Sequence, residues 1–160
     1  MKAAALHDIK SELTNTSKTQ LIDLCLRLAK FKKENKELLS YMLFDSVDEQ
    51  LYVENIKTEL LFQFGEMNTT HLYFVKKSLR KILRVLTKYI RYTGSAEVEV
   101  KLLLFFCLTL NKSGIPINKN PVIKNIYQNQ LKKVSKTIAG MHEDLQYEYV
   151  KELAQLVREE

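Results

Sequence analysis

The stretch from residue 69 to residue 93 reads TTHLYFVKKSLRKILRVLTKYIRYT. Successive residues of an α-helix lie about 100° apart around its axis. On that spacing the large aliphatic side chains fall within an arc of about 100°, and the basic side chains fall within an opposite arc of about 140°. The apolar set is Leu72, Val75, Leu79, Ile82, Leu83, Leu86 and Ile90, and the basic set is Lys76, Lys77, Arg80, Lys81, Arg84, Lys88 and Arg91. The pattern predicts one long amphipathic helix that buries its apolar side and presents its cations.

The neighbouring residues predict the ends of this helix and the start of the next one. Asn68 is its expected N-terminal cap, and Gly94 is the residue type that best adopts the left-handed conformation after a helix. Ser95 is a cap for a second helix that runs from Ala96 to about Lys112. Because residues 102–110 are apolar nearly all round, that helix needs neighbours on several sides. We expect it to be the central core helix.

The C-terminal third contains one clear break and one ambiguous one. After the irregular segment 114–119, Asn120 and Pro121 form the pair of a cap and a first-turn proline that opens a helix. This helix is expected to reach about Ala139. Gly140 then either separates it from a C-terminal helix or sits within one long kinked helix.

The N-terminal third carries two capping-box patterns, in which two residues three positions apart satisfy each other's backbone N–H groups. They are Ser17 with Gln20, and Ser46 with Glu49. The first box is expected to open a helix that reaches about Lys30, and the second a helix that reaches about Gly65. A short helix over residues 3–13 precedes them, and a third helix between them is expected to include Leu38, Leu39, Met42 and Leu43.

These elements predict an all-α protein of about eight helices in a single domain over residues 1–160. Four glycines and two prolines leave little material for tight turns between strands. Short links favour antiparallel hairpins, which can stack as an α-α superhelix or close as a helical bundle. Cys25 and Cys107 are expected to be buried, reduced thiols that act as small hydrophobes. The absence of a signal peptide and of a membrane-spanning run predicts a cytoplasmic protein.

Known catalytic and metal-binding patterns are missing from the sequence. His7, His71 and His142 are the only histidines, and none has metal-ligand spacing. No glycine-rich phosphate loop and no nucleophile motif occurs. We therefore predict no catalytic residue, no metal site and no cofactor, and the sequence favours a protein that is not an enzyme. A site assembled from residues distant in sequence stays open.

Charge is the strongest functional signal. Residues 67–139 contain fourteen Lys or Arg and two acidic residues, a charge of +12, whereas the segments before and after carry −2 and −4. Segregated charge of this kind predicts an anionic partner or an acidic surface within the fold. Internal neutralisation would come from acidic residues of flanking helices, namely Glu54, Glu59, Glu66, Glu143, Asp144, Glu148 and Glu152. Otherwise the cationic face is solvated or binds a partner.

Residues 21–44 include LAKFKKENKELL over 28–39, and residues 75–94 include RKILR and KYIRY. These two stretches resemble an all-helical bacterial family of unknown function. The resemblance spans most of the chain. The chain also resembles α-α superhelical proteins of HEAT or armadillo type. The resemblance implies stacked hairpins and a scaffold role, and it implies no catalytic residue.

The leading hypothesis from the sequence is a non-catalytic interaction or scaffold module that binds an acidic protein through the seven basic residues. The alternative is a sequence-tolerant nucleic-acid-binding protein that contacts the phosphate backbone through the same residues. In that case Tyr73 and Tyr92 are candidate stacking groups for bases. An anionic membrane surface is a weaker third partner, because the apolar side of the helix is needed for the core.

Overall fold

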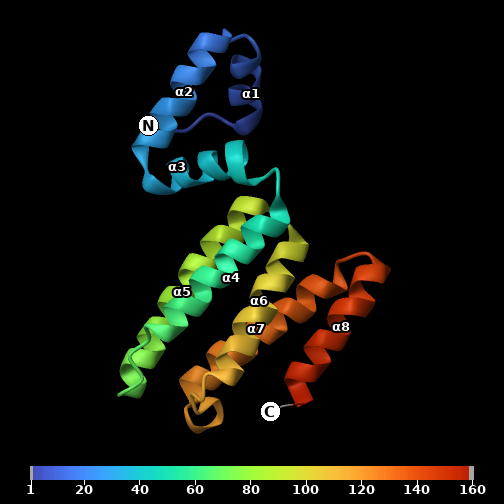
Figure 1. Ribbon diagram of the computed structural model, residues 1–160. Helices are drawn as coiled ribbons and strands as arrows, with labels where there is room; N and C mark the ends of the chain where they lie inside the picture. The colour runs from blue at the N-terminus through green and yellow to red at the C-terminus, as the bar shows by residue number, and fades with distance from the viewer. Residues whose placement is uncertain (1, 159–160) are drawn as a thin grey trace. The chain divides into compact units, whose positions relative to one another are not determined.

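The computed structural model describes residues 2–158, and within them all regular structure is helical (Figure 1). Eight α-helices, one π-helical turn and one 3₁₀ turn cover this part of the chain, without a β-strand. The predicted all-α class is therefore confirmed. The chain divides into two compact units, residues 1–44 and residues 45–160. The single domain over residues 1–160 stays a prediction.

The first unit contains three short helices and almost no buried side chain. Its elements are α1 (Leu6–Thr14), α2 (Lys18–Phe31), α3 (Lys33–Ser40) and the start of a π-helical turn (Tyr41–Asp45). The predicted capping box is present, because the Ser17 backbone N–H donates to Gln20 Oε1 at 3.2 Å and the Gln20 N–H donates to Ser17 Oγ at 3.4 Å.

Burial in this unit differs from the prediction. Tyr41 is the one buried residue among positions 2–44. Cys25 is exposed, so its predicted burial is wrong, whereas Cys107 is buried as expected. The reason is the small number of neighbours, since α2 packs mainly against α3 and the unit has no further layer to cover the remaining faces.

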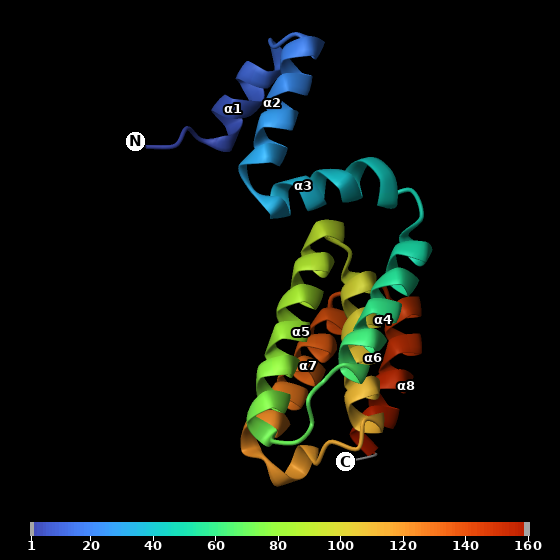
Figure 2. The same cartoon turned by 60° about the vertical axis from the view of Figure 1, so that its left-hand side comes forward.

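The second unit consists of five long helices around one central element. They are α4 (Glu49–Gly65), α5 (Leu72–Thr93), α6 (Ala96–Lys112), α7 (Pro121–Ala139) and α8 (Glu143–Arg158), with a 3₁₀ turn at Ile117–Lys119. Successive helices alternate in direction (Figures 1 and 2). Helix α6 contacts α4, α5, α7 and α8, and eight of its residues are buried. The prediction of α6 as the central core helix is confirmed.

Three helix starts lie later than the sequence pattern indicated, and the first is that of α1, which begins at Leu6 and not at about residue 3. Asp48, and not Ser46, caps α4, because its Oδ1 accepts the Leu51 backbone N–H at 2.9 Å. Asn68 does not cap α5, because its side chain accepts the N–H of Thr70 in a local turn at 3.0 Å and the helix begins only at Leu72. Sequence spacing selected Ser46 and Asn68 as caps. In the structure Asp48 lies next to the first residue of α4 and caps it, and Asn68 forms a turn that ends before α5 begins.

The other boundaries follow the predicted signals. Gly94 has φ of 62° and ends α5, and the Ser95 side chain accepts the Val98 N–H at 3.3 Å. Asn120 caps α7 by accepting two backbone N–H groups ahead of Pro121. A separate helix α8 begins at Glu143, so the alternative of one long kinked helix is excluded.

Candidate functional site

Helix α5 is anchored through its apolar side. Five of the seven predicted core positions are buried, namely Val75, Leu79, Ile82, Leu86 and Ile90. Leu83 is partly buried and packs against the core, whereas Leu72 is 39% exposed. Leu72 departs from the prediction because it is the first residue of the helix. The burial of one full stripe fixes the rotation of α5 about its axis and directs the opposite side outward.

That opposite side carries the seven predicted basic residues, Lys76, Lys77, Arg80, Lys81, Arg84, Lys88 and Arg91, which we call the basic surface. Five of them are exposed, and Lys76 and Lys88 are half-buried. Six of the seven, all except Lys88, form no ion pair with a carboxylate within residues 2–158. The Lys88 Nζ lies 5.2 Å from the centre of the Tyr89 ring. The basic surface is thus largely without internal counter-charges.

Two of the acidic residues that could have neutralised it, Glu54 and Glu59, make other contacts. Glu54 Oε1 pairs with Lys57 Nζ at 2.9 Å on the same helix. Glu59 Oε2 accepts a hydrogen bond from the Tyr89 hydroxyl at 3.3 Å. The two acids of α6 also bind elsewhere, Glu97 to Lys101 and Glu99 to Lys133. Direct ion pairing therefore leaves the positive potential of the basic surface in place.

The two candidate stacking residues differ in accessibility. Tyr73 is 64% exposed and makes an edge-on contact with Phe74, with the ring centres 5.4 Å apart. Tyr92 is half-buried and lies near Tyr89 at 6.3 Å. Tyr73 lies three residues before Lys76, so an exposed aromatic ring precedes the cations in α5. Phe74, which sequence reasoning missed, is 39% exposed beside it.

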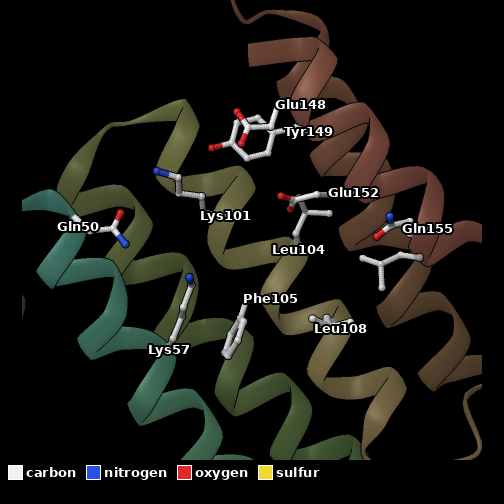
Figure 3. A pocket seen from close by; sticks show the side chains of 11 residues that line it. Gln50, Lys57, Lys101, Leu104, Phe105, Leu108, Glu148, Tyr149, Glu152 and Gln155 are labelled. Atoms are coloured by element: carbon white, nitrogen blue, oxygen red, sulfur yellow. The ribbon is translucent and has the colours of Figure 1, made fainter. Parts of the chain in front are cut away.

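A second feature of this unit is a groove of about 500 Å³ between α4 and α8 (Figure 3). Its floor is the outer side of α6, where Leu104 is buried and Phe105 and Leu108 are half-buried. The remaining lining residues come from three helices and are Gln50, Lys57, Lys101, Glu148, Tyr149, Glu152, Gln155 and Leu156. The sequence could not reveal this groove, because its lining residues come from three helices that only the packing brings together.

The cations of the groove are neutralised. Lys101 Nζ lies 2.7 Å from Glu97 Oε1, and the Tyr149 hydroxyl donates to the same oxygen at 3.2 Å. The hydrogen bond from Lys101 lowers the pKa of Glu97, so this carboxylate stays ionised. Burial, with the negative charge of Glu97, raises the pKa of Tyr149 well above its ordinary value near 10. Lys57 is matched by Glu54 and lies over the Phe105 ring at 5.4 Å.

The carboxylates of the opposite wall are not neutralised. Glu148 and Glu152 are exposed on α8, one helical turn apart, and neither forms an ion pair within the described residues. Because Lys57 and Lys101 are already paired, the groove presents these two negative charges above an apolar floor. It contains no histidine and no cysteine, and residues 2–158 hold no group of three or more potential metal-ligating side chains.

No family model matches the chain, and neither a curated protein nor a solved structure shows significant similarity to it. The resemblance to a bacterial family is therefore not supported by these comparisons. Among the described helices, none has the length and apolarity that crossing a bilayer requires.

Proposed function

We propose that the protein is a non-catalytic helical interaction module that binds an acidic protein partner through the basic surface of α5. One observation carries the proposal: the apolar side of α5 is buried, while six of its seven cations have no carboxylate partner within residues 2–158. A partner with regularly spaced carboxylates would neutralise charges that the fold leaves unmatched.

The physics of exposed charges sets the expected character of this binding. Exposed ion pairs each contribute little, about 0.2–1 kcal/mol, and they are screened over roughly 8 Å at physiological ionic strength. A row of such pairs accelerates encounter and fixes the orientation of the partner more than it raises affinity. Arg80 and Arg84 are the strongest candidate anchors, since both are exposed and a guanidinium binds a carboxylate through two parallel hydrogen bonds.

A second candidate function is sequence-tolerant binding of single-stranded nucleic acid. The exposed ring of Tyr73 favours it, because bases stack on aromatic rings next to a cationic track. Phosphates would then occupy the positions that carboxylates occupy in the leading proposal. This binding should weaken about 100-fold between about 50 and 200 mM salt if about five phosphates are contacted.

One titration separates the two functions. Two fluorescein-labelled probes are used at both salt concentrations: a helical peptide with glutamates four residues apart, and a twenty-nucleotide oligothymidylate. The leading proposal expects the peptide to bind more tightly than the oligonucleotide, and the double variant Arg80→Glu/Arg84→Glu to lose that binding. Failure of the peptide to bind at low salt would refute the leading proposal. Tight binding of the oligonucleotide alone, sensitive to Tyr73→Ala, would establish the second candidate.

The matched control lies on another helix. Lys132→Glu/Lys136→Glu changes the net charge of the chain by the same amount at two exposed positions of α7. If the signal depends on the basic surface, this variant binds as the wild type does. An equal loss in both double variants would mean that net charge, and not the arrangement on α5, determines binding.

The proposal also covers the arrangement of the helices and the cellular location of the protein. We propose stacked α-α hairpins of HEAT or armadillo type in a cytoplasmic protein of bacterial origin, and a scaffold role for it. Stacked hairpins require antiparallel neighbours, and α4 to α8 alternate in direction (Figure 1). Fold alone does not specify function, so the binding titration remains the decisive test.

A further inference from the structure

The second unit carries unmatched charges of both signs on different helices. Helix α5 presents the basic surface, and α8 presents Asp144, Glu148 and Glu152 at intervals of four residues along one side. Asp144 lies 3.3 Å from the His142 ring, and the two glutamates have no ion-pair partner within the described residues. Helices α5 and α8 lie on opposite sides of this unit in both views (Figures 1 and 2). One molecule therefore does not match these charges by itself.

The groove beside α8 has the features of an acceptor for a basic helix. Its floor of Leu104, Phe105 and Leu108 offers apolar surface for the aliphatic stems of arginine and lysine (Figure 3). Glu148 and Glu152 stand along one wall. The lysines of the other wall are held by Glu54 and Glu97, which limits their repulsion of a cationic helix.

We propose that this groove binds the basic surface of a second copy of the chain. The inference rests on the proposed function, because it names the acidic partner of α5 as the α8 wall of another copy. Arg80 and Arg84 are four residues apart, as are Glu148 and Glu152, so both pairs repeat at about 6 Å along their helices. Each guanidinium of one copy then binds one carboxylate of the other through two hydrogen bonds. The Phe105 ring already has Lys57 Nζ 5.4 Å from its centre, so it contributes apolar surface for the side-chain stems of the bound helix.

The contact is of the head-to-tail type. Each copy uses α5 toward one neighbour and the groove toward another, so the same contact can repeat. Depending on the rotation between copies, the product is a closed ring or an open chain. Because the contact relies on charge, it forms at low salt and dissociates as salt rises.

Charge exchange between two variants tests the proposal. Variant A is Arg80→Glu/Arg84→Glu, and variant B is Glu148→Lys/Glu152→Lys; all four positions are exposed. Sedimentation velocity is measured at about 20 mM and at about 500 mM salt. Wild type is expected to associate in proportion to its concentration at the lower salt and to be monomeric at the higher. A alone and B alone should lose this association, and an equimolar mixture of A and B should regain it, since the reversed surfaces are again complementary.

Several results would overturn the inference. The inference is wrong if the wild type is monomeric at low salt. It is also wrong if variant A or variant B alone still associates, or if the mixture of A and B stays monomeric. Circular dichroism checks that A and B are folded. If a reversal unfolds the chain, Arg80→Gln/Arg84→Gln and Glu148→Gln/Glu152→Gln replace the reversed variants, and each should weaken association.

The same variants separate this inference from the proposed function. Variant B keeps the basic surface, so it must still bind the labelled glutamate peptide if α5 recognises acidic proteins. Peptide binding by a strictly monomeric wild type would retain the proposed function and reject the second copy as partner. Binding of a labelled oligolysine to monomeric wild type, lost in B, would also reject it and assign the groove to a foreign basic partner.

Discussion

The two compact units of this chain share helical patterning and differ in burial. Both contain amphipathic helices, yet Tyr41 is the one buried side chain in residues 2–44, whereas α6 alone buries eight. Helix α2 has exposed large apolar residues on several sides, among them Ile22, Leu26 and Leu28. The difference shows that apolar periodicity is sufficient to predict a helix and insufficient to predict a core. A core requires several neighbours around one element, as α6 has.

The sharpest way to test this contrast is to remove one large side chain from each unit. Phe106 is fully buried in α6 and packs against Phe64, with the ring centres 5.7 Å apart. Phe106→Ala should lower the free energy of unfolding by about 3–5 kcal/mol, because it removes buried surface and leaves a cavity. Leu26→Ala in α2, at a position 49% exposed, should cost less than about 1 kcal/mol.

Urea unfolding followed by circular dichroism and tyrosine fluorescence measures both variants. Equal losses would contradict the contrast, because they would mean that Leu26 is buried in solution as deeply as Phe106. A loss confined to Phe106→Ala would locate the stabilising core around α6.

A second difference is the use of glycine, since all four glycines lie in residues 45–160. Gly94 has φ of 62°, a backbone conformation that residues with a side chain rarely adopt. A Cβ added there would have no atom within 4 Å, so the cost of Gly94→Ala comes from backbone strain and not from a steric clash. Gly94→Ala should cost about 1–2 kcal/mol, the penalty of a left-handed residue. Gly65→Ala has ordinary φ and open space, so it should be neutral or slightly stabilising in the same unfolding measurement.

Comparable caps in the two units offer a smaller test. Asn120 caps α7 and Ser17 caps α2, each through its side-chain oxygen. Asn120→Ala and Ser17→Ala should each destabilise their own helix by about 1 kcal/mol. Amide hydrogen exchange should show faster exchange across the second unit for Asn120→Ala, and faster exchange limited to the first unit for Ser17→Ala. Faster exchange of α6 in Ser17→Ala would show that the units unfold together.

The sequence was sufficient for the helices and for part of the core. Period-3.6 patterning located α5 and its five buried positions, and glycine and cap residues located most helix ends. The misses have local causes. Asp48 competes with Ser46 for the cap of α4, and Asn68 forms a turn before α5 begins. Cys25 is exposed because burial depends on neighbours, which periodicity does not contain.

The candidate site was predicted less completely. The basic surface lies in one helix, so its residues could be identified from sequence spacing alone. The groove could not, because Lys57, Phe105 and Glu152 come from three helices whose packing brings them together. The pairing of Lys57 and Lys101 also could not be foreseen, and this pairing leaves Glu148 and Glu152 as the unmatched charges of the groove.

The smallest expected effect concerns the pH dependence of the second unit. Lys101 lowers the pKa of Glu97 in the folded chain, so the folded state binds this proton less readily than the unfolded chain does. The contribution is present above the ordinary carboxyl pKa of 4.5 and is lost as pH falls through the lowered value. Because the Glu97 side chain is 35% exposed, solvent screening holds the effect below about 1 kcal/mol.

Glu97→Gln should therefore lose stability at neutral pH and show a flatter decline below pH 4.5 than wild type, in urea titrations at several pH values. Glu12→Gln, at an exposed position of α1, is the control from the first unit and should leave the acid decline of the second unit unchanged. A wild-type decline that persists in Glu97→Gln would mean that other carboxylates govern it. In that case the contact among Glu97, Lys101 and Tyr149 would contribute to the shape of the groove and not to the acid stability of the core.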